Sequence, residues 1–167
     1  GTIVKAYTDN KIIVLNGEKE FQLTSGTKNN IHITSKTSAG LSNIFQTKSG
    51  DLFYMVKKAV KNITLHNDSI FGNCFFYDAV EDCDRNIWIG SSVGLIRFNT
   101  AEGKFTQYTY ESSNPNSVSS NYIYAVEVDD SCRQVWMAAY NGGLCSFNIS
   151  SGLFRNYTKD DGLPDNI

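Results

Sequence analysis

The sequence predicts an all-β fold of repeated four-stranded antiparallel sheets, and two observations support this prediction. First, NIWIGSSVGLIRFN at residues 86–99 recurs as QVWMAAYNGGLCSFN at residues 134–148, with the two tryptophans 48 residues apart. Second, no segment has a helical apolar period over the length of a helix. Units of about 40 to 50 residues with several short strands are typical of β-propeller blades. We therefore expect a propeller fragment of about three to four blades with little or no helix.

Each complete copy of the repeat reads as four strands joined by turns. The first strand ends in an acidic pair, Glu81-Asp82 or Asp129-Asp130, which is typical of a hairpin turn rather than of a general acid and base. The tryptophan in the second strand supplies a large apolar body for packing between blades. The predicted strands are residues 76–81, 87–90, 95–99 and 104–108 in one copy, and 123–128, 135–138, 144–148 and 153–158 in the next.

Glycines follow the second strand of each copy, where a tight turn needs a positive φ or a close backbone approach. One residue is inserted near Tyr140, so the later landmarks lie 49 residues apart. The structural landmarks of the repeat are Trp88, Gly90, Gly94 and Leu95 in the first copy and Trp136, Gly142, Gly143 and Leu144 in the second.

The whole chain divides into units of unequal regularity. Residues 1–40 read as a partial blade plus a polar linker, in which the short alternating run at 31–34 is an edge strand or part of a long loop. Because a blade needs neighbours to cover its faces, we expect the chain to be a fragment of a larger propeller. The other units are a degenerate blade at 41–73, blades at 74–117 and 118–161, and the start of another blade at 162–167.

Charge and hydropathy argue against two classes of partner for this segment, although a polyanion could still bind a local basic patch. The net charge is −2, and the lysines are spread among acidic residues, so the sequence has no electrostatic footprint for nucleic acid. The longest purely aliphatic run, residues 12–15, is far shorter than the roughly 20 residues that span a bilayer. We therefore expect no nucleic-acid and no membrane contact.

The four cysteines are too few for a disulfide scaffold, and they lack the CxxC spacing of a zinc site. Cys83 and Cys132 fall in equivalent turns before the two tryptophans. A bridge between them would need Cα atoms within about 7 Å, a distance that the sequence does not supply. Free thiols are favoured over a bridge on burial preferences.

The quoted stretches, continued by GKFTQY and by GLFRNYTKDDGLPDNI, closely resemble the two-component regulator propeller repeat. The usual text of that repeat is an acidic turn, LWIGT, GL with an aromatic strand, an F..Y strand and a GLP.N link. The resemblance is strong over about residues 76–167. It implies the periplasmic sensor region of a hybrid two-component histidine kinase of the Bacteroidetes type. Such sensors respond to carbohydrates released from glycans, and the resemblance further implies a homodimeric parent protein with additional blades.

We expect no catalytic site, metal site or cofactor. The only imidazoles, His32 and His66, lie in dissimilar contexts that match neither a zinc nor a triad pattern. Ligand contacts are expected on loops where the two copies differ, because loops on a rigid scaffold carry binding. The candidates are Asn121, Tyr122, Tyr140 and Asn141, whose amides and rings suit the hydroxyls and the apolar face of a sugar.

Three functions compete on this evidence. The favoured one is a non-catalytic extracytoplasmic module that senses oligosaccharides and signals to a distant kinase. The second is a protein-interaction propeller without a small ligand, since one fold serves many functions. The third, a propeller lyase resembling the virginiamycin-inactivating family, would need a histidine and acids grouped at the axis, and the two histidines make it the weakest.

Overall fold

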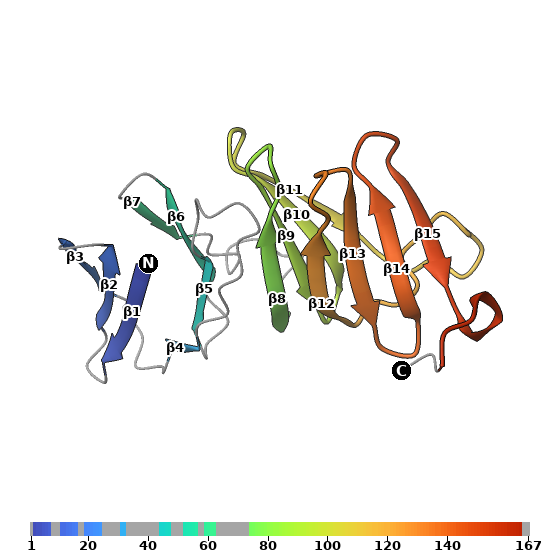
Figure 1. Ribbon diagram of the computed structural model, residues 1–167, viewed down its shortest axis with the longest axis horizontal. Helices are drawn as coiled ribbons and strands as arrows, with labels where there is room; N and C mark the ends of the chain where they lie inside the picture. The colour runs from blue at the N-terminus through green and yellow to red at the C-terminus, as the bar shows by residue number, and fades with distance from the viewer. Residues whose placement is uncertain are drawn as a thin grey trace.

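The computed structural model describes residues 74–164 in full and the backbone of seven strands between residues 2 and 62. Its strands form four antiparallel sheets that follow one another in chain order (Figure 1). The all-β prediction is confirmed. In the described part of the chain, the only helical element is the 3-10 turn η2, Lys159–Asp161, and no helix has the length and apolarity needed to cross a bilayer.

The first two sheets come from the less regular half of the sequence. In the second sheet, the short strand at residue 31 pairs with β5 and forms an edge, as one of the two sequence interpretations expects. His66 lies outside the described residues, as does the side chain of His32. The strands are β1 Thr2–Tyr7, β2 Lys11–Asn16 and β3 Lys19–Thr24 in one sheet, and β4 Ile31–His32, β5 Ile44–Thr47, β6 Leu52–Val56 and β7 Ala59–Asn62 in the other.

The two copies of the tryptophan repeat form two sheets of the same topology, each a meander of four strands. Both first strands carry an irregularity at the same place, between Phe76 and Asp78 and between Ile123 and Ala125. The predicted strands are confirmed to within one residue at each end. They are β8 Phe76–Glu81, β9 Asn86–Ser91, β10 Gly94–Asn99 and β11 Lys104–Tyr108, then β12 Ile123–Val128, β13 Gln134–Ala139, β14 Gly143–Asn148 and β15 Leu153–Tyr157.

The turn glycines have the backbone roles that the repeat predicts. Gly94 and Gly143 begin the third strands with φ of +109° and +70°, and a Cβ at Gly94 would overlap the carbonyl oxygen of Tyr108. Gly90 serves packing between the sheets instead, because its Cβ would lie 2.6 Å from the carbonyl oxygen of Ile123 on β12. These positions explain why the repeat contains glycine where β-propensity alone would favour a larger residue.

The main core lies between the β8–β11 sheet and the β12–β15 sheet. Trp88 is fully buried there, with its ring 5.3 Å from that of Phe147 on the neighbouring sheet and stacked on Tyr108 at 6.1 Å. Its indole N–H donates to the Asp82 carboxylate at 2.8 Å, so the polar atom of the buried ring is satisfied. The tryptophan therefore joins two consecutive blades, as predicted from the sequence.

Trp136 stacks on a tyrosine of its own sheet, as Trp88 does, but its outer face is not covered in the same way. It stacks on Tyr157 at 5.7 Å with an interplanar angle of 29°, matching the 24° between Trp88 and Tyr108. Unlike Trp88, it is only half-buried, because none of the described residues forms a sheet over it. The two tryptophans thus occupy equivalent positions on consecutive blades.

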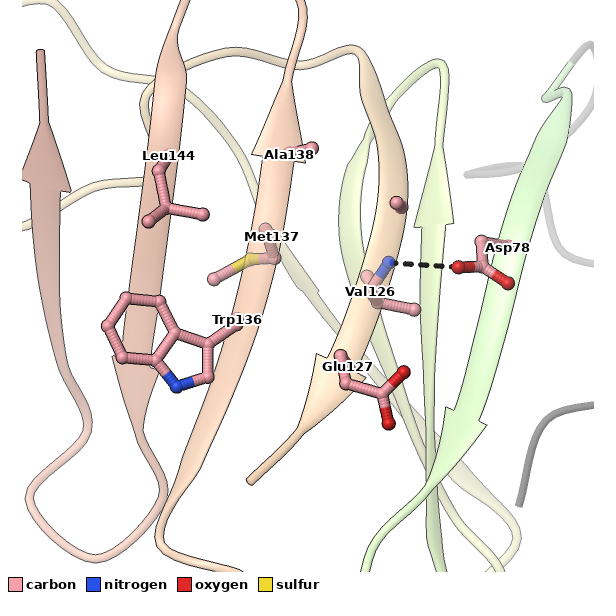
Figure 2. A pocket seen from close by; sticks show the side chains of 8 residues that line it. Asp78, Val126, Glu127, Trp136, Met137, Ala138 and Leu144 are labelled. Atoms are coloured by element: carbon pink, nitrogen blue, oxygen red, sulfur yellow. Dashed lines mark hydrogen bonds between the residues drawn. The ribbon is translucent and has the colours of Figure 1, made fainter. Parts of the chain in front are cut away.

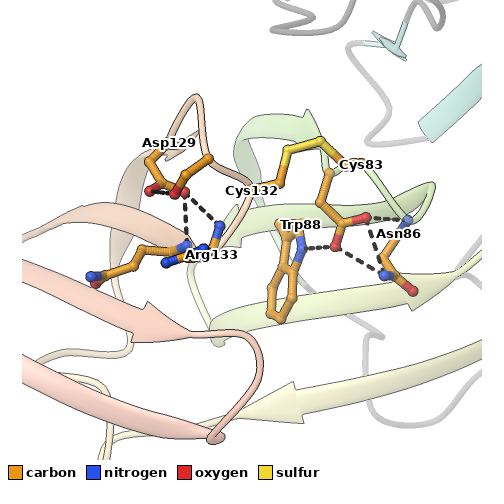
Figure 3. The surroundings of a disulfide bond; sticks show 9 residues. Cys83, Asn86, Trp88, Asp129, Cys132 and Arg133 are labelled. Atoms are coloured by element: carbon orange, nitrogen blue, oxygen red, sulfur yellow. Dashed lines mark hydrogen bonds between the residues drawn. A yellow bond between two sulfur atoms is a disulfide. The ribbon is translucent and has the colours of Figure 1, made fainter.

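The expectation of free thiols at Cys83 and Cys132 is wrong, because the two residues form a disulfide across a Cα–Cα distance of 5.9 Å. The bridge joins the β8–β9 turn to the β12–β13 turn (Figure 3). Face-to-face packing brings the equivalent turns of the two sheets together, which is a long-range consequence of the fold. Asp82 and Asp129 hold these turns by accepting hydrogen bonds from the backbone N–H groups of Asn86 and of residues 133–134.

The remaining two cysteines are free. Burial raises the pKa of the Cys145 thiol to about 11, and burial also raises the pKa of Cys74. Thiols with raised pKa are poor nucleophiles at neutral pH. Both cysteines therefore serve as small apolar side chains.

Candidate ligand site

Two pockets open on the outer face of the β12–β15 sheet. One, of about 270 Å³, lies between Trp136, Leu144 and the carboxylates of Asp78 and Glu127 (Figure 2). The other, of about 300 Å³, lies between Tyr124 and the segment after η2. The two pockets share Ala138 and Leu144.

The repeat identifies this face as a packing surface. Trp136, Ala138 and Leu144 correspond to Trp88, Gly90 and Leu95 of the preceding sheet, and the latter three are buried beneath β12–β15. The same three positions are half-buried or exposed on the last sheet. Since equivalent positions have equivalent roles in a repeat array, we assign Trp136, Ala138 and Leu144 to packing against a further sheet. Tyr124 lines the second pocket and also belongs to the group of tyrosines described next.

Four tyrosines form an exposed cluster where the two sheets meet, and we refer to Tyr77, Tyr122, Tyr124 and Tyr140 as the tyrosine cluster. The rings contact one another edge to face: Tyr77 and Tyr124 at 4.7 Å, Tyr124 and Tyr140 at 5.8 Å, and Tyr122 and Tyr140 at 6.5 Å. Three of the rings are 48% exposed. So much exposed aromatic surface in one place on a domain is typical of a binding site.

Two strands and two loops hold the cluster in place. Tyr77 lies on β8 and Tyr124 on β12, so adjacent sheets contribute one ring each. Tyr140 is in the β13–β14 turn, and its N–H donates to the carbonyl of Tyr122 at 2.9 Å, which ties that turn to the segment before β12. Mutual packing and this backbone bond restrict the rings before any ligand binds, so less conformational entropy is lost on binding.

The repeated sequence contains a pattern that could have predicted the tyrosine cluster. Tyr124 follows Tyr77 by 47 residues, and Tyr122 follows the 70% exposed Phe75 by the same interval. Aromatic residues thus recur at positions that do not serve the core. The sequence analysis sought ligand contacts only where the copies differ, and it therefore missed Tyr77, Tyr124 and Phe75.

The four residues that the sequence singled out separate into two kinds. Tyr122 and Tyr140 lie together in the cluster. Asn121 has a bracing role, since its side-chain oxygen accepts from the N–H of Tyr110 at 2.7 Å and its carbonyl accepts from the N–H of Gly94 at 2.7 Å. Asn141 occupies the turn with φ of +55°, a conformation that asparagine tolerates, and its side chain is exposed beside Tyr140.

The Tyr77 hydroxyl is a neutral hydrogen-bonding group at physiological pH. Burial raises the pKa of Tyr77, and the neighbouring hydroxyls of Tyr124 and Tyr122 raise it further. A neutral phenol both donates and accepts a hydrogen bond. The cluster therefore offers apolar ring surface together with convergent neutral polar groups.

Metal chemistry has no support in the described part of the chain, where no group of three or more histidine, cysteine or acidic side chains is placed to hold an ion. The acidic pairs lie at the turns. Glu81 forms an ion pair with Arg85 at 3.0 Å, and Asp82 accepts hydrogen bonds from Asn86 and Trp88. These carboxylates stabilise the hairpins.

Comparison with known proteins identifies the fold. No protein-family model and no curated protein matches the chain. Among solved structures, it is similar to the extracellular domain of BT3049 from B. thetaiotaomicron, described as a hybrid two component system, with a TM-score of 0.55 at 20% identity over 74% of this chain and 19% of that one. It is also similar to the extracellular domain of BT4673 from the same organism, described both as a one component and as a hybrid two component system.

The BT4673 match has a TM-score of 0.58 at 18% identity and covers 89% of this chain and 20% of that one. The chain thus spans about a fifth of the length of the solved structures that it resembles. At these identities the likeness establishes the fold. The fold implied by the sequence resemblance is confirmed, and it is that of part of the extracellular domains of such bacterial systems.

Proposed function

We propose that the chain is part of a non-catalytic extracytoplasmic sensor of a hybrid two-component histidine kinase, and that this sensor recognises carbohydrate. The observation that carries the proposal is the tyrosine cluster, which presents four restrained rings, three of them about half exposed, at the junction of two blades. The fold shared with extracellular domains of two-component systems supports the sensor role.

Sugar chemistry suits this surface. One face of a pyranose ring carries mainly C–H groups, which pack on an aromatic ring, while its hydroxyls need donors and acceptors. The tyrosine cluster offers both kinds of group, and the exposed amide of Asn141 lies beside it. Rings at three different angles can accommodate an oligosaccharide that bends over the junction.

The disulfide supports a location outside the cytoplasm. Cys83 and Cys132 join two blades, and such structural bridges persist in oxidising compartments such as the bacterial periplasm. We therefore place this segment in the periplasm, with the kinase on the other side of the membrane. The resemblance to the two-component repeat adds a homodimeric parent protein.

The open face of the β12–β15 sheet suits a further blade of the same propeller. Its exposed or half-buried positions, Trp136, Ala138 and Leu144, repeat the positions that β12–β15 covers on the preceding sheet. A blade stacked there would bury them in the same way. A ligand bound at the junction of two blades could then shift the stacking of the array, which is a route from binding to signal.

A protein partner is the second candidate ligand. Exposed tyrosines also anchor protein interfaces, where aromatic residues are frequent among the residues that dominate affinity. The same cluster would therefore serve a protein-interaction scaffold, and the choice between the two rests on binding experiments.

Titration calorimetry tests the proposal. The purified protein would be titrated with maltohexaose, cellohexaose and mannohexaose, and with oligogalacturonate and heparin-derived hexasaccharides. Binding of any of these supports carbohydrate recognition. Absence of heat with all of them over a range of temperatures contradicts it and favours the scaffold.

A further inference from the structure

We infer that the tyrosine cluster takes an electrically neutral oligosaccharide, which lies across the junction between the β8–β11 and β12–β15 sheets. This inference rests on the proposed carbohydrate recognition. It adds that the sugar is uncharged and that both sheets must contact it.

The span of the site follows from the order of the ring contacts. Tyr77 on β8 contacts Tyr124 on β12, Tyr124 contacts Tyr140, and Tyr140 contacts Tyr122. The row thus starts on one sheet and continues on the next. Consecutive centroids lie 4.7 to 6.5 Å apart, so a ligand of several sugar units is needed to cover the row.

The charge class follows from the carboxylates beside the rings. Asp78 is the residue next to Tyr77, and Glu127 is three residues after Tyr124, which is about 10 Å along a strand. Salt at about 0.1 M substantially screens the exposed Glu127 charge over that distance, so Asp78 beside Tyr77 is the stronger source of repulsion. Asp78 and Glu127 line the same pocket (Figure 2), and an anionic sugar on the Tyr77 ring would be repelled by the adjacent Asp78 carboxylate.

The Asp78 carboxylate is built into the junction itself. It accepts from the N–H of Ala79 at 3.0 Å and, across the two sheets, from the N–H of Val126 at 3.1 Å. These two hydrogen bonds hold the carboxylate in place next to Tyr77. The negative charge is therefore a fixed part of the site.

Five of the six basic side chains in residues 74–164 have described partners outside the cluster, and one of these is Arg133, whose charge acts on the Asp129 carboxylate. The sixth is Lys159. Arg85 pairs with Glu81 at a turn, Lys104 pairs with Glu102, and Arg155 lies over the ring of Tyr157. Arg97 lies over the Trp88 ring and donates to Asn86. Sulfated and uronic-acid sugars are usually held by arginine and lysine, so the described surroundings of the cluster favour neutral sugars.

The test combines two sets of probes with three variants of the cluster and one control. Calorimetry compares the neutral hexasaccharides with the acidic ones at low and high salt. Tyr77→Ala and Tyr124→Ala remove one ring from each sheet, while Tyr124→Phe keeps the ring and removes its hydroxyl. Leu153→Ala is the matched surface control, because Leu153 is 55% exposed and pairs with Asn148, at the opposite end of β14 from the Tyr140 turn.

We expect a neutral hexasaccharide to bind with an affinity that salt does not change. Tyr77→Ala and Tyr124→Ala should each weaken binding by about tenfold or more, and Tyr124→Phe, which keeps the ring, should weaken it by less than Tyr124→Ala does. Leu153→Ala should change the affinity by less than about threefold. The melting temperature of each variant, measured in parallel, identifies any loss that comes from unfolding.

Three outcomes would overturn the inference. Binding of an acidic hexasaccharide without any neutral one would refute the charge class and leave carbohydrate sensing standing. Neutral binding that survives both alanine variants would refute the site. If no hexasaccharide of either kind binds, the proposed function itself fails and the inference fails with it.

Discussion

The bridge between Cys83 and Cys132 gives a stability prediction whose size follows from the loop that it closes. The two residues are 49 apart in sequence. In the chain-entropy description, closing such a loop lowers the entropy of the unfolded chain by about 14 cal/mol/K, which is about 4 kcal/mol at 25 °C. The double variant Cys83→Ser, Cys132→Ser should therefore lose about 2–4 kcal/mol of unfolding free energy.

Urea denaturation, with circular dichroism as the readout, measures this loss directly. For a chain of this size, about 2–4 °C of melting temperature corresponds to 1 kcal/mol, so scanning calorimetry should show a fall of roughly 5–15 °C. Reductant should destabilise the natural protein and leave the double variant unchanged. Cys74→Ser is the matched control, because Cys74 is free and half-buried.

Two results would refute the reasoning. The first is a loss below about 1 kcal/mol in the double variant, which would fall under the range for native bridges. The second is four reactive thiols in the unfolded, unreduced protein. The structure predicts only two, those of Cys74 and Cys145.

Three further predictions concern the repeat. Trp88→Ala should lower the unfolding free energy, measured by urea denaturation, by about 3–5 kcal/mol, and Trp136→Ala should lower it by less than about 2 kcal/mol, because only the Trp88 ring is fully buried. Equal losses would show that both rings are covered. Gly94→Ala should destabilise by more than Gly103→Ala, since both have positive φ but only Gly94 is crowded by backbone, and a larger loss at Gly103 would contradict this. Hydrogen bonds from a serine hydroxyl and from turn N–H groups hold the pKa of Asp129 below its ordinary value. The Asp129 carboxylate should therefore stabilise the fold fully above about pH 4, and this stabilisation should be lost as the pH falls through the lower pKa of the folded state. The difference in unfolding free energy between the natural protein and Asp129→Asn should then disappear in acid. A difference that persists in acid would oppose the assignment.

Local patterns in the sequence were sufficient to predict the strands. The tryptophan strand, the glycine that follows it and the acidic turn before it lie within about 15 residues of one another, and each acts through short-range backbone preferences. The 3-10 turn at Lys159–Asp161 also had a local signal that the sequence analysis did not use. Thr158 and Asp161 form a reciprocal capping box, and the spacing of the two residues is visible in the sequence.

The bridge and most of the tyrosine cluster depended on how two sheets pack. Cys83 and Cys132 approach one another only because equivalent turns of adjacent sheets meet, and the repeat gives no distance between blades. Tyr77 and Tyr124 come together for the same reason. Tyr140 was predicted because it lies at the inserted turn residue, and Tyr122 because it lies in the loop before the first strand of its copy; both are local features of the sequence.

The most direct test of the account is a crystal structure of the protein with a bound neutral hexasaccharide. We predict that sugar rings will lie against Tyr77 of one blade and Tyr124 of the next, with Trp88 and Trp136 each stacked on the tyrosine of its own sheet. A sugar bound on a single sheet away from these rings, or tryptophans in unlike surroundings, would contradict it.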